Sequence, residues 1–313
     1  MKVAITGGYG YIGSRIAERL LIEGHEVSIL DIQKDDTKRN LDKCHFIQCD
    51  ITKYNTLPNF SNNEINVLMH LAAQSSGGKS FEIPETDINI NILGTLNMIK
   101  WCGSNNVKRI IFASSFTVYG DNTESELYQE DMPCNPKSLY ALSKYTGERY
   151  LQIYGEHIGV KWNIIRMFNV YGPGQDLTRM DQGVVSIFLS MIHKGDYVGV
   201  RGSLDRFRDL VFIDDVVEGW VQCLHQPEQS NEIFNLGSGT KTTIADLINT
   251  IIEVYGKTGK VKVEEIGTTP GDIMGCYADI SKITEKLGYF PNYDLKVGIK
   301  RFKEWADEFC KID

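Results

Sequence analysis

The sequence predicts an α/β protein built on a doubly wound parallel sheet. Short apolar, β-branched runs recur through the first half of the chain, and amphipathic stretches of helical length separate several of them. Strands of this continuously apolar kind are typical of parallel sheets, because helices cover both sheet faces. The predicted strands are Val3–Thr6, Val27–Leu30, His45–Gln48, Asn66–His70, Arg109–Ala113 and Trp162–Arg166.

The alternation of strands and helices ends near Tyr171, and the rest of the chain predicts a smaller, mostly C-terminal α/β region. A helix is expected from Gly183 to Lys194, a strand from Leu210 to Ile213, and a final amphipathic helix from Val297 to Phe309. We therefore expect one domain over residues 1–171, to which a segment near 210–240 returns. Residues 172–209 and 241–313 would form the second domain.

Composition limits the kinds of partner. The 313 residues carry a formal net charge of −8, which disfavours nucleic acid, and no apolar run is long enough to span a membrane. The chain begins without a signal-peptide pattern. Seven scattered cysteines without C-x-x-C spacing indicate a reducing cytoplasmic setting, and we expect no metal site.

A glycine-rich turn follows the first strand. Gly7, Gly10 and Gly13 lie three residues apart, just before the helical stretch Ser14–Glu23. Such a turn lets backbone N–H groups approach a pyrophosphate, although glycine also serves tight turns alone. Asp31 ends the second strand 18 residues after Gly13. A carboxylate there suits the adenosine ribose hydroxyls and repels a 2′-phosphate, which favours NAD over NADP, unless Asp31 is a capping or solvated residue.

The segment Thr6–Gly13 resembles the T-G-x-x-G-x-x-G fingerprint of the extended short-chain dehydrogenase/reductase family, which has a Rossmann-type fold. Asp50-Ile51, Leu71-Ala72-Ala73 and the N-x-x-G-T segment at Asn91 match further family motifs. Alternatively, Asn91 satisfies neighbouring backbone within a helix. The resemblance implies that NAD contacts Gly7, Gly10, Tyr11, Ile12, Gly13, Asp31, Asp50, Ile51, Leu71, Ala72, Ala73, Asn91, Tyr140, Lys144 and Phe168.

Tyr140 and Lys144 stand four residues apart, on the same face of a predicted helix. The neighbouring ammonium is expected to lower the pKa of the phenol, so that Tyr140 can exchange a proton with a sugar hydroxyl. Ser114–Gly120 resembles the family segment S-S-x-x-V-Y-G, which implies a catalytic set of Ser115, Tyr140 and Lys144, with Thr117 assisting. Alternatively, these hydroxyls cap the following turn.

Four positions resemble substrate contacts of nucleotide-sugar enzymes in this family. Asn169 and Arg208 match diphosphate contacts, although either residue can serve the fold alone. Asp272 lies in the family's R-P-G-D segment, where Thr269 replaces the arginine. Cys276 matches a position beside the sugar C2 group, where a small residue would admit an N-acetylhexosamine. A buried Cys276 acting as a small hydrophobe is equally compatible with the sequence.

The pair Phe116-Thr117 replaces the acidic pair of the family's 4,6-dehydratases. The resemblance therefore implies an NAD-dependent 4-epimerase of a nucleotide-diphosphate hexose, most like a UDP-hexose 4-epimerase. A dehydratase, a 4-ketosugar reductase and a non-catalytic NAD sensor are the alternatives. Helices around Asn91–Trp101 and Lys137–Tyr154 resemble the family's dimer-forming pair, and we expect a homodimer.

Overall fold

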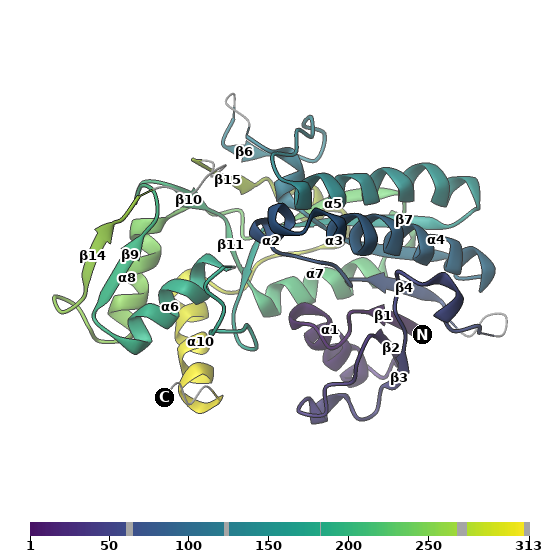
Figure 1. Cartoon of the computed structure of the whole chain (residues 1–313), viewed down its shortest axis with the longest axis horizontal. Helices are drawn as coiled ribbons and strands as arrows, with labels where there is room; N and C mark the ends of the chain where they lie inside the picture. The colour runs from purple at the N-terminus through teal and green to yellow at the C-terminus, as the bar shows by residue number, and fades with distance from the viewer. Residues whose placement is uncertain (61–64, 122–124, 182, 268–273, 310–313) are drawn as a thin grey trace.

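The computed structural model describes residues 1–60, 65–121, 125–181, 183–267 and 274–309 (Figure 1). Its centre is a seven-stranded sheet in which all neighbouring strands pair in parallel. Across the sheet the strands are β12 (Glu232–Leu236), β7 (Lys161–Met167), β5 (Arg109–Ser115), β4 (Val67–His70), β1 (Lys2–Thr6), β2 (Glu26–Asp31) and β3 (His45–Gln48). The prediction of a doubly wound Rossmann-type sheet is confirmed. All six predicted strands form, and β12 is the seventh.

Helices cover both faces of the sheet because consecutive strand residues point to opposite sides. Ile5 and Ile29 pack in one core with α1 (Tyr11–Ile22) and α7 (Ile213–His225). Their neighbours Ala4 and Leu30 pack in a second core with α4 (Thr95–Ser104). The helix α5 (Leu139–Tyr150) lies beside α4 on this second face (Figure 1).

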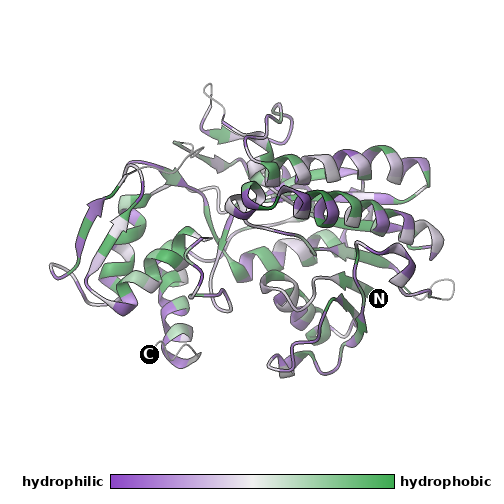
Figure 2. Cartoon of the chain, in the orientation of Figure 1, coloured by the Kyte–Doolittle hydropathy of each residue, from purple (hydrophilic) through white to green (hydrophobic). Residues whose placement is uncertain are grey.

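Three smaller sheets lie beyond the central one. The first contains β13 (Thr242–Thr243), β10 (Phe207–Arg208), β15 (Gly275–Ala278) and β6 (Leu127–Tyr128). The other two pair β8 (Asn169–Tyr171) with β11 (Leu210–Phe212), and β9 (Tyr197–Val200) with β14 (Lys262–Glu265). The helices of this part are α6 (Val184–Lys194), α8 (Ile244–Val254), α9 (Ser281–Leu287) and α10 (Leu295–Phe309). Figure 2 shows strongly hydrophobic stretches on α6 and α8, which pack together.

The remaining helical segments are short or irregular. They are the α-helices α2 (Gly77–Glu82) and α3 (Pro84–Thr86), the π-helices η3 (Asp87–Gly94) and η5 (Leu151–Gly155), and the 3₁₀ turns η1 (Arg39–Leu41), η2 (Tyr54–Thr56), η4 (Phe116–Tyr119) and η6 (Pro227–Gln229). The segment η3 runs directly into α4, and η5 continues α5. Within the described ranges, no helix is both long and apolar enough to cross a bilayer.

Candidate active site

A cavity of about 570 Å³ lies at the carboxyl ends of β1, β4 and β5. Open parallel sheets bind their ligands at this edge. The cavity brings together thirteen of the residues predicted from the sequence: Gly7, Gly10, Tyr11, Ile12, Gly13, Leu71, Ala73, Ser115, Thr117, Tyr140, Lys144, Phe168 and Asn169.

The glycine-rich turn is tightly packed against itself and against the end of β4. Gly7 has φ +67°, and a Cβ atom there would lie 2.9 Å from the backbone of Ala72. A Cβ atom at Gly13 would lie 2.2 Å from the carbonyl oxygen of Gly7. Gly10 is the residue that precedes α1, and it has no side chain that could cap the helix. N–H groups in the first turn of α1 therefore remain available to a ligand beside the cavity. These features fit a pyrophosphate group bound at the start of α1.

Asp31 lies at the end of β2, next to the glycine-rich turn. Its carboxylate accepts hydrogen bonds from the N–H groups of Tyr9, at 3.1 Å, and Ile32, at 2.8 Å. The sequence reasoning missed Lys38, whose Nζ donates to the carbonyl oxygen of Tyr9 and, at 3.1 Å, to Ser14 Oγ. Asp31 and Lys38 therefore hold the outer side of the turn, and Asp31 does not line the cavity itself.

Three other predicted cofactor residues, Asp50, Ile51 and Ala72, also lie outside the cavity lining. Asp50 accepts hydrogen bonds from the backbone and hydroxyl of Thr52 and pairs with Lys53 at 3.2 Å. The Thr52 hydroxyl is the main cause of the lowered pKa of Asp50. Ile51 is buried in the core shared with α4, and Ala72 is the close neighbour of Gly7.

Ser115, Tyr140 and Lys144 all line the cavity. The Thr117 hydroxyl donates to Ser115 Oγ at 2.9 Å, and Ser115 also accepts the backbone N–H of Thr117, so it both caps η4 and faces the cavity. The Lys144 ammonium lies 4.4 Å from the ring centroid of Phe112.

The pKa of Tyr140 moves in the direction opposite to the one expected from Lys144. Burial raises the pKa of Tyr140 to about 12, and a hydrogen bond with Ser115 only partly offsets this rise. Burial also lowers the pKa of Lys144 to about 8, against the opposing effects of Glu148 and Asp87. The low-dielectric surroundings, which a four-residue spacing cannot reveal, therefore decide the direction of both shifts.

Asn91 does not line the cavity but holds the loop that follows β4. Its Oδ1 accepts the N–H of Gln74 at 2.9 Å, and its Nδ2 donates to the Gln74 carbonyl oxygen, Asp87 Oδ1 and Ser143 Oγ. Ser143 immediately precedes Lys144. This buried network connects the loop after β4 with α5, and its central carboxylate, Asp87, was missed by sequence reasoning.

The predicted substrate residues are separated in space. Asn169 lines the cavity and donates from Nδ2 to the Asp209 carbonyl oxygen at 3.1 Å. Arg208 and Cys276 face each other in the register of β10 and β15, and neither lines the cavity. Cys276 is fully buried in one apolar cluster with Phe168, as a small hydrophobe would be. Asp272 and Thr269 lie outside the described residues.

Three further polar residues line the cavity from the segment after β8. They are Gln175, Asp176 and Arg179, which the sequence reasoning missed. Arg179 forms an ion pair with Asp181 at 2.7 Å, and Ser76 donates to the same carboxylate at 3.3 Å. The only sequence signal was their position directly after the glycine-containing turn at Gly172-Pro173-Gly174.

Comparison with known proteins assigns the family. The model of the NAD-dependent epimerase/dehydratase family matches residues 3–237. The chain therefore belongs to this family, and its cofactor is NAD.

Individual relatives cover nearly the whole chain. A protein of Methanocaldococcus jannaschii, provisionally named as a UDP-glucose 4-epimerase, is 35% identical and aligns over 97% of each chain. The structure of the UDP-glucose 4-epimerase of Thermus thermophilus in complex with NAD is similar at a TM-score of 0.88, with 32% identity over 99% of this chain and 100% of that one. The UDP-N-acetylglucosamine 4-epimerase of Methanobrevibacter ruminantium, in complex with UDP-N-acetylmuramic acid, has a TM-score of 0.87 and 29% identity, with 98% of each chain covered.

Proposed function

We propose that this protein epimerises a UDP-hexose at C4, with NAD as a cofactor that is regenerated in each turnover. The observation that carries the proposal is the meeting of Ser115, Tyr140 and Lys144 in the cavity onto which the glycine-rich turn opens. The relatives named as UDP-sugar 4-epimerases support the same reaction.

In this reaction Tyr140 removes the proton from the sugar O4 and later returns it. NAD, when bound, would supply a positive charge and a reversible hydride acceptor for C4, which would allow oxidation to a 4-keto sugar and reduction on its opposite face. Ser115 donates a hydrogen bond to the reacting oxygen, and Thr117 orients Ser115. Lys144 holds positive charge near the phenol. Because burial raises the pKa of Tyr140, a nearby cation is needed to stabilise its phenolate.

The residues after Ser115 favour epimerisation over 4,6-dehydration. Dehydration needs a protonated group to act on the leaving hydroxyl. Phe116 carries no ionisable group and stacks on Phe168 with ring centroids 5.2 Å apart, while the Thr117 hydroxyl donates to Ser115. Neither side chain is a carboxylic acid.

We propose that two parts of the chain bind different ligands. Residues 1–171, with the returning segment near 210–240, bind NAD, and residues 172–209 and 241–313 bind the sugar nucleotide. Support comes from the cavity, to which the first part contributes the glycine-rich turn and the second contributes Gln175 and Arg179. Asn169, near the end of the first part, and Arg208, in the second part, are the proposed diphosphate contacts. Asp272 would contact the nucleotide, and Cys276 would leave room at the sugar C2 group.

We also propose that the protein forms a homodimer through η3, α4, α5 and η5. The helix α5 packs against η3 and continues into η5, and apolar side chains of these three segments remain exposed. They are Ile88, Leu93, Leu142, Tyr150 and Ile153, with exposed fractions from 40% to 65%. A second copy of the same surface would bury these side chains through a two-fold axis.

Product analysis tests the reaction. The protein is incubated without reductant with UDP-glucose, UDP-N-acetylglucosamine and UDP-glucuronate, and with the dTDP and GDP forms of glucose. We expect C4 epimers from UDP-sugars without net NADH, and turnover of UDP-N-acetylglucosamine if Cys276 leaves room at C2. Tyr140→Phe should lose at least about 1000-fold in kcat, because proton transfer is removed, whereas Tyr150→Phe on the same helix keeps full activity. A 4-keto-6-deoxy product, or turnover only with added NAD(P)H, would instead identify a dehydratase or a reductase.

A further inference from the structure

Two histidines and a glutamate converge at the edge of the sheet opposite the active site. Glu23 follows α1, His25 precedes β2, and His225 is the last residue of α7. The two histidine Nε2 atoms are 3.3 Å apart. Glu23 Oε2 lies 3.7 Å from His25 Nε2 and 3.6 Å from His225 Nε2. Three atoms of the kind that bind metals thus form a nearly equilateral triangle.

The carboxylate is oriented by a residue outside the triangle. Arg19 Nε donates to Glu23 Oε1 at 2.6 Å, and Arg19 in turn pairs with Glu218 at 3.0 Å. This arrangement leaves Oε2 turned toward both imidazoles. In metal sites, a side chain that binds the ion is regularly held in place by a hydrogen bond to another residue.

The spacing agrees with tetrahedral coordination. Zinc binds histidine nitrogen and carboxylate oxygen at about 2.0–2.2 Å, which puts neighbouring ligand atoms of a tetrahedron about 3.3–3.6 Å apart. The three observed separations, 3.3, 3.6 and 3.7 Å, are close to this range. Two imidazoles and one carboxylate also suit zinc better than calcium or magnesium, which prefer oxygen ligands.

We propose that Glu23, His25 and His225 bind one divalent ion of the zinc class, with water in the fourth position. Each imidazole would bind the ion through Nε2, the nitrogen that faces Glu23 Oε2.

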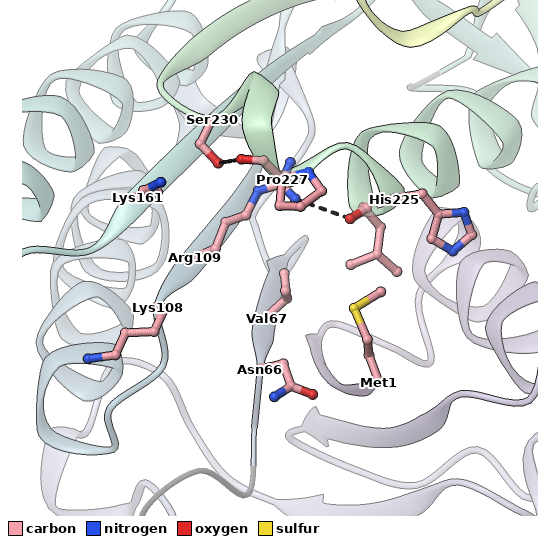
Figure 3. A pocket seen from close by; sticks show the side chains of 10 residues that line it. Met1, Asn66, Val67, Lys108, Arg109, Lys161, His225, Pro227 and Ser230 are labelled. Atoms are coloured by element: carbon pink, nitrogen blue, oxygen red, sulfur yellow. Dashed lines mark hydrogen bonds between the residues drawn. The ribbon is translucent and has the colours of Figure 1, made fainter.

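The proposed site is remote from the reaction. His225 and Met1 belong to the lining of a second cavity of about 610 Å³, which lies at the amino ends of β1, β4, β5 and β7. Figure 3 shows His225 at one side of this cavity, with its ring turned away from Lys108 and Lys161. An ion here would join the end of α7 to the connection between α1 and β2, and so stabilise the fold without touching Tyr140.

Zinc binding to the untagged, chelator-treated full chain tests the proposal. In competition with a chromophoric chelator, the wild type should bind one Zn²⁺ per chain, and Zn²⁺ should raise its unfolding temperature. His225→Ala, at an exposed position, should weaken binding at least about 100-fold and abolish the temperature shift. His157→Ala, at an exposed histidine outside the triangle, should leave both unchanged.

Cobalt gives an independent readout. Co²⁺ should produce the visible absorption of a four-coordinate site in the wild type and in His157→Ala, but not in His225→Ala. Absence of stoichiometric zinc binding, or equal binding by the two histidine variants, would overturn the proposal and leave a hydrogen-bonded triad. Both variants should keep wild-type turnover, so failure of the metal site and failure of the proposed reaction are separate results.

Discussion

His70, the last residue of β4, is a buried histidine with both ring nitrogens engaged. Its Nδ1 lies 2.7 Å from Thr6 Oγ1 and its Nε2 lies 3.0 Å from Thr95 Oγ1. The Thr6 hydroxyl also accepts the N–H groups of Leu71 and Ala72, both at 3.2 Å. Because its two lone pairs are then in use, this hydroxyl must donate to Nδ1, and Nε2 carries the ring proton. His70 is thus neutral and holds the turn that closes on Gly7.

Acid should destabilise the protein through His70. Burial, aided by the charge of Lys144, lowers the pKa of His70 to about 3, below its ordinary value of about 6.5. The unfolded chain then binds more protons than the folded one between these values, so stability falls as pH falls below about 6.5. From pH 7 to pH 5 the wild type should lose about 2 kcal/mol more in free energy of unfolding than His70→Gln. Urea titrations at both pH values measure this difference, and equal losses would contradict the assignment.

Tyr140 and Lys144 illustrate the limit of prediction at this scale. A Tyr and a Lys four apart on a helix predict that Tyr140 and Lys144 lie on one face, and both line the cavity. The direction of the Tyr140 pKa was not predictable, because it depends on burial and on residues distant in the chain. Asp87, from η3, is one of the charges that act on both residues.

Among the elements, the glycine-rich turn was predictable from the sequence, whereas β12 was not among the predicted strands. The glycine spacing predicts the turn because only backbone atoms fit where Gly13 approaches Gly7. The strand β12 has a polar residue, Asn235, in its buried interior. The Asn235 side chain accepts from the Tyr119 hydroxyl at 2.6 Å and donates to the Tyr128 carbonyl oxygen at 2.8 Å. These partners are more than a hundred residues away in the sequence. The sequence alone therefore does not explain why a polar residue interrupts the apolar pattern of β12.

Gly13→Ala should disrupt cofactor binding. The added Cβ atom would lie 2.2 Å from the Gly7 carbonyl oxygen and 3.0 Å from Gly8 Cα, so the turn must move away from α1. We expect at least a tenfold weaker affinity for NAD, which corresponds to about 1.4 kcal/mol, within the usual cost of overpacking. Gly195→Ala is the matched control, because its Cβ atom meets no neighbour within 4 Å. Calorimetric titration of cofactor-free protein compares the variants, and unchanged affinity in Gly13→Ala would refute the role of the turn.

At the scale of the whole molecule, exposed apolar side chains of η3, α5 and η5 carry the proposed dimer contact. Ile153→Glu together with Leu142→Glu should convert the dimer into a monomer, because buried carboxylates without partners oppose association. Light scattering after gel filtration should show the mass fall from twice 35.4 kDa to 35.4 kDa. Phe290→Glu, at an exposed residue after α9, should leave the dimer intact. A monomeric wild type would remove the basis for the interface.

Sequence patterns predict sites formed by one or two neighbouring segments better than sites assembled from distant ones. The glycine-rich turn and the Tyr140–Lys144 pair are local motifs, and both reach the cavity. The Glu23, His25 and His225 triangle combines residues 200 positions apart, and the expectation of no metal site was based on cysteine spacing alone. Only the packing of α1 beside α7 brings these side chains together.

The strand β12 lies beyond residue 171 in the sequence but pairs with β7 in the central sheet, so the chain cannot be divided at residue 171 without exposing β7. A fragment that ended at residue 171 would retain the glycine-rich turn and Tyr140, but it would lack β12 and α7. From Asn163 to Met167, β7 would then be a sheet edge without a partner strand, and the apolar residues that α7 covers would be open to water. Such an edge recruits strands from other molecules. The N-terminal fragment should therefore aggregate on expression, unless a linker restores residues 210–240.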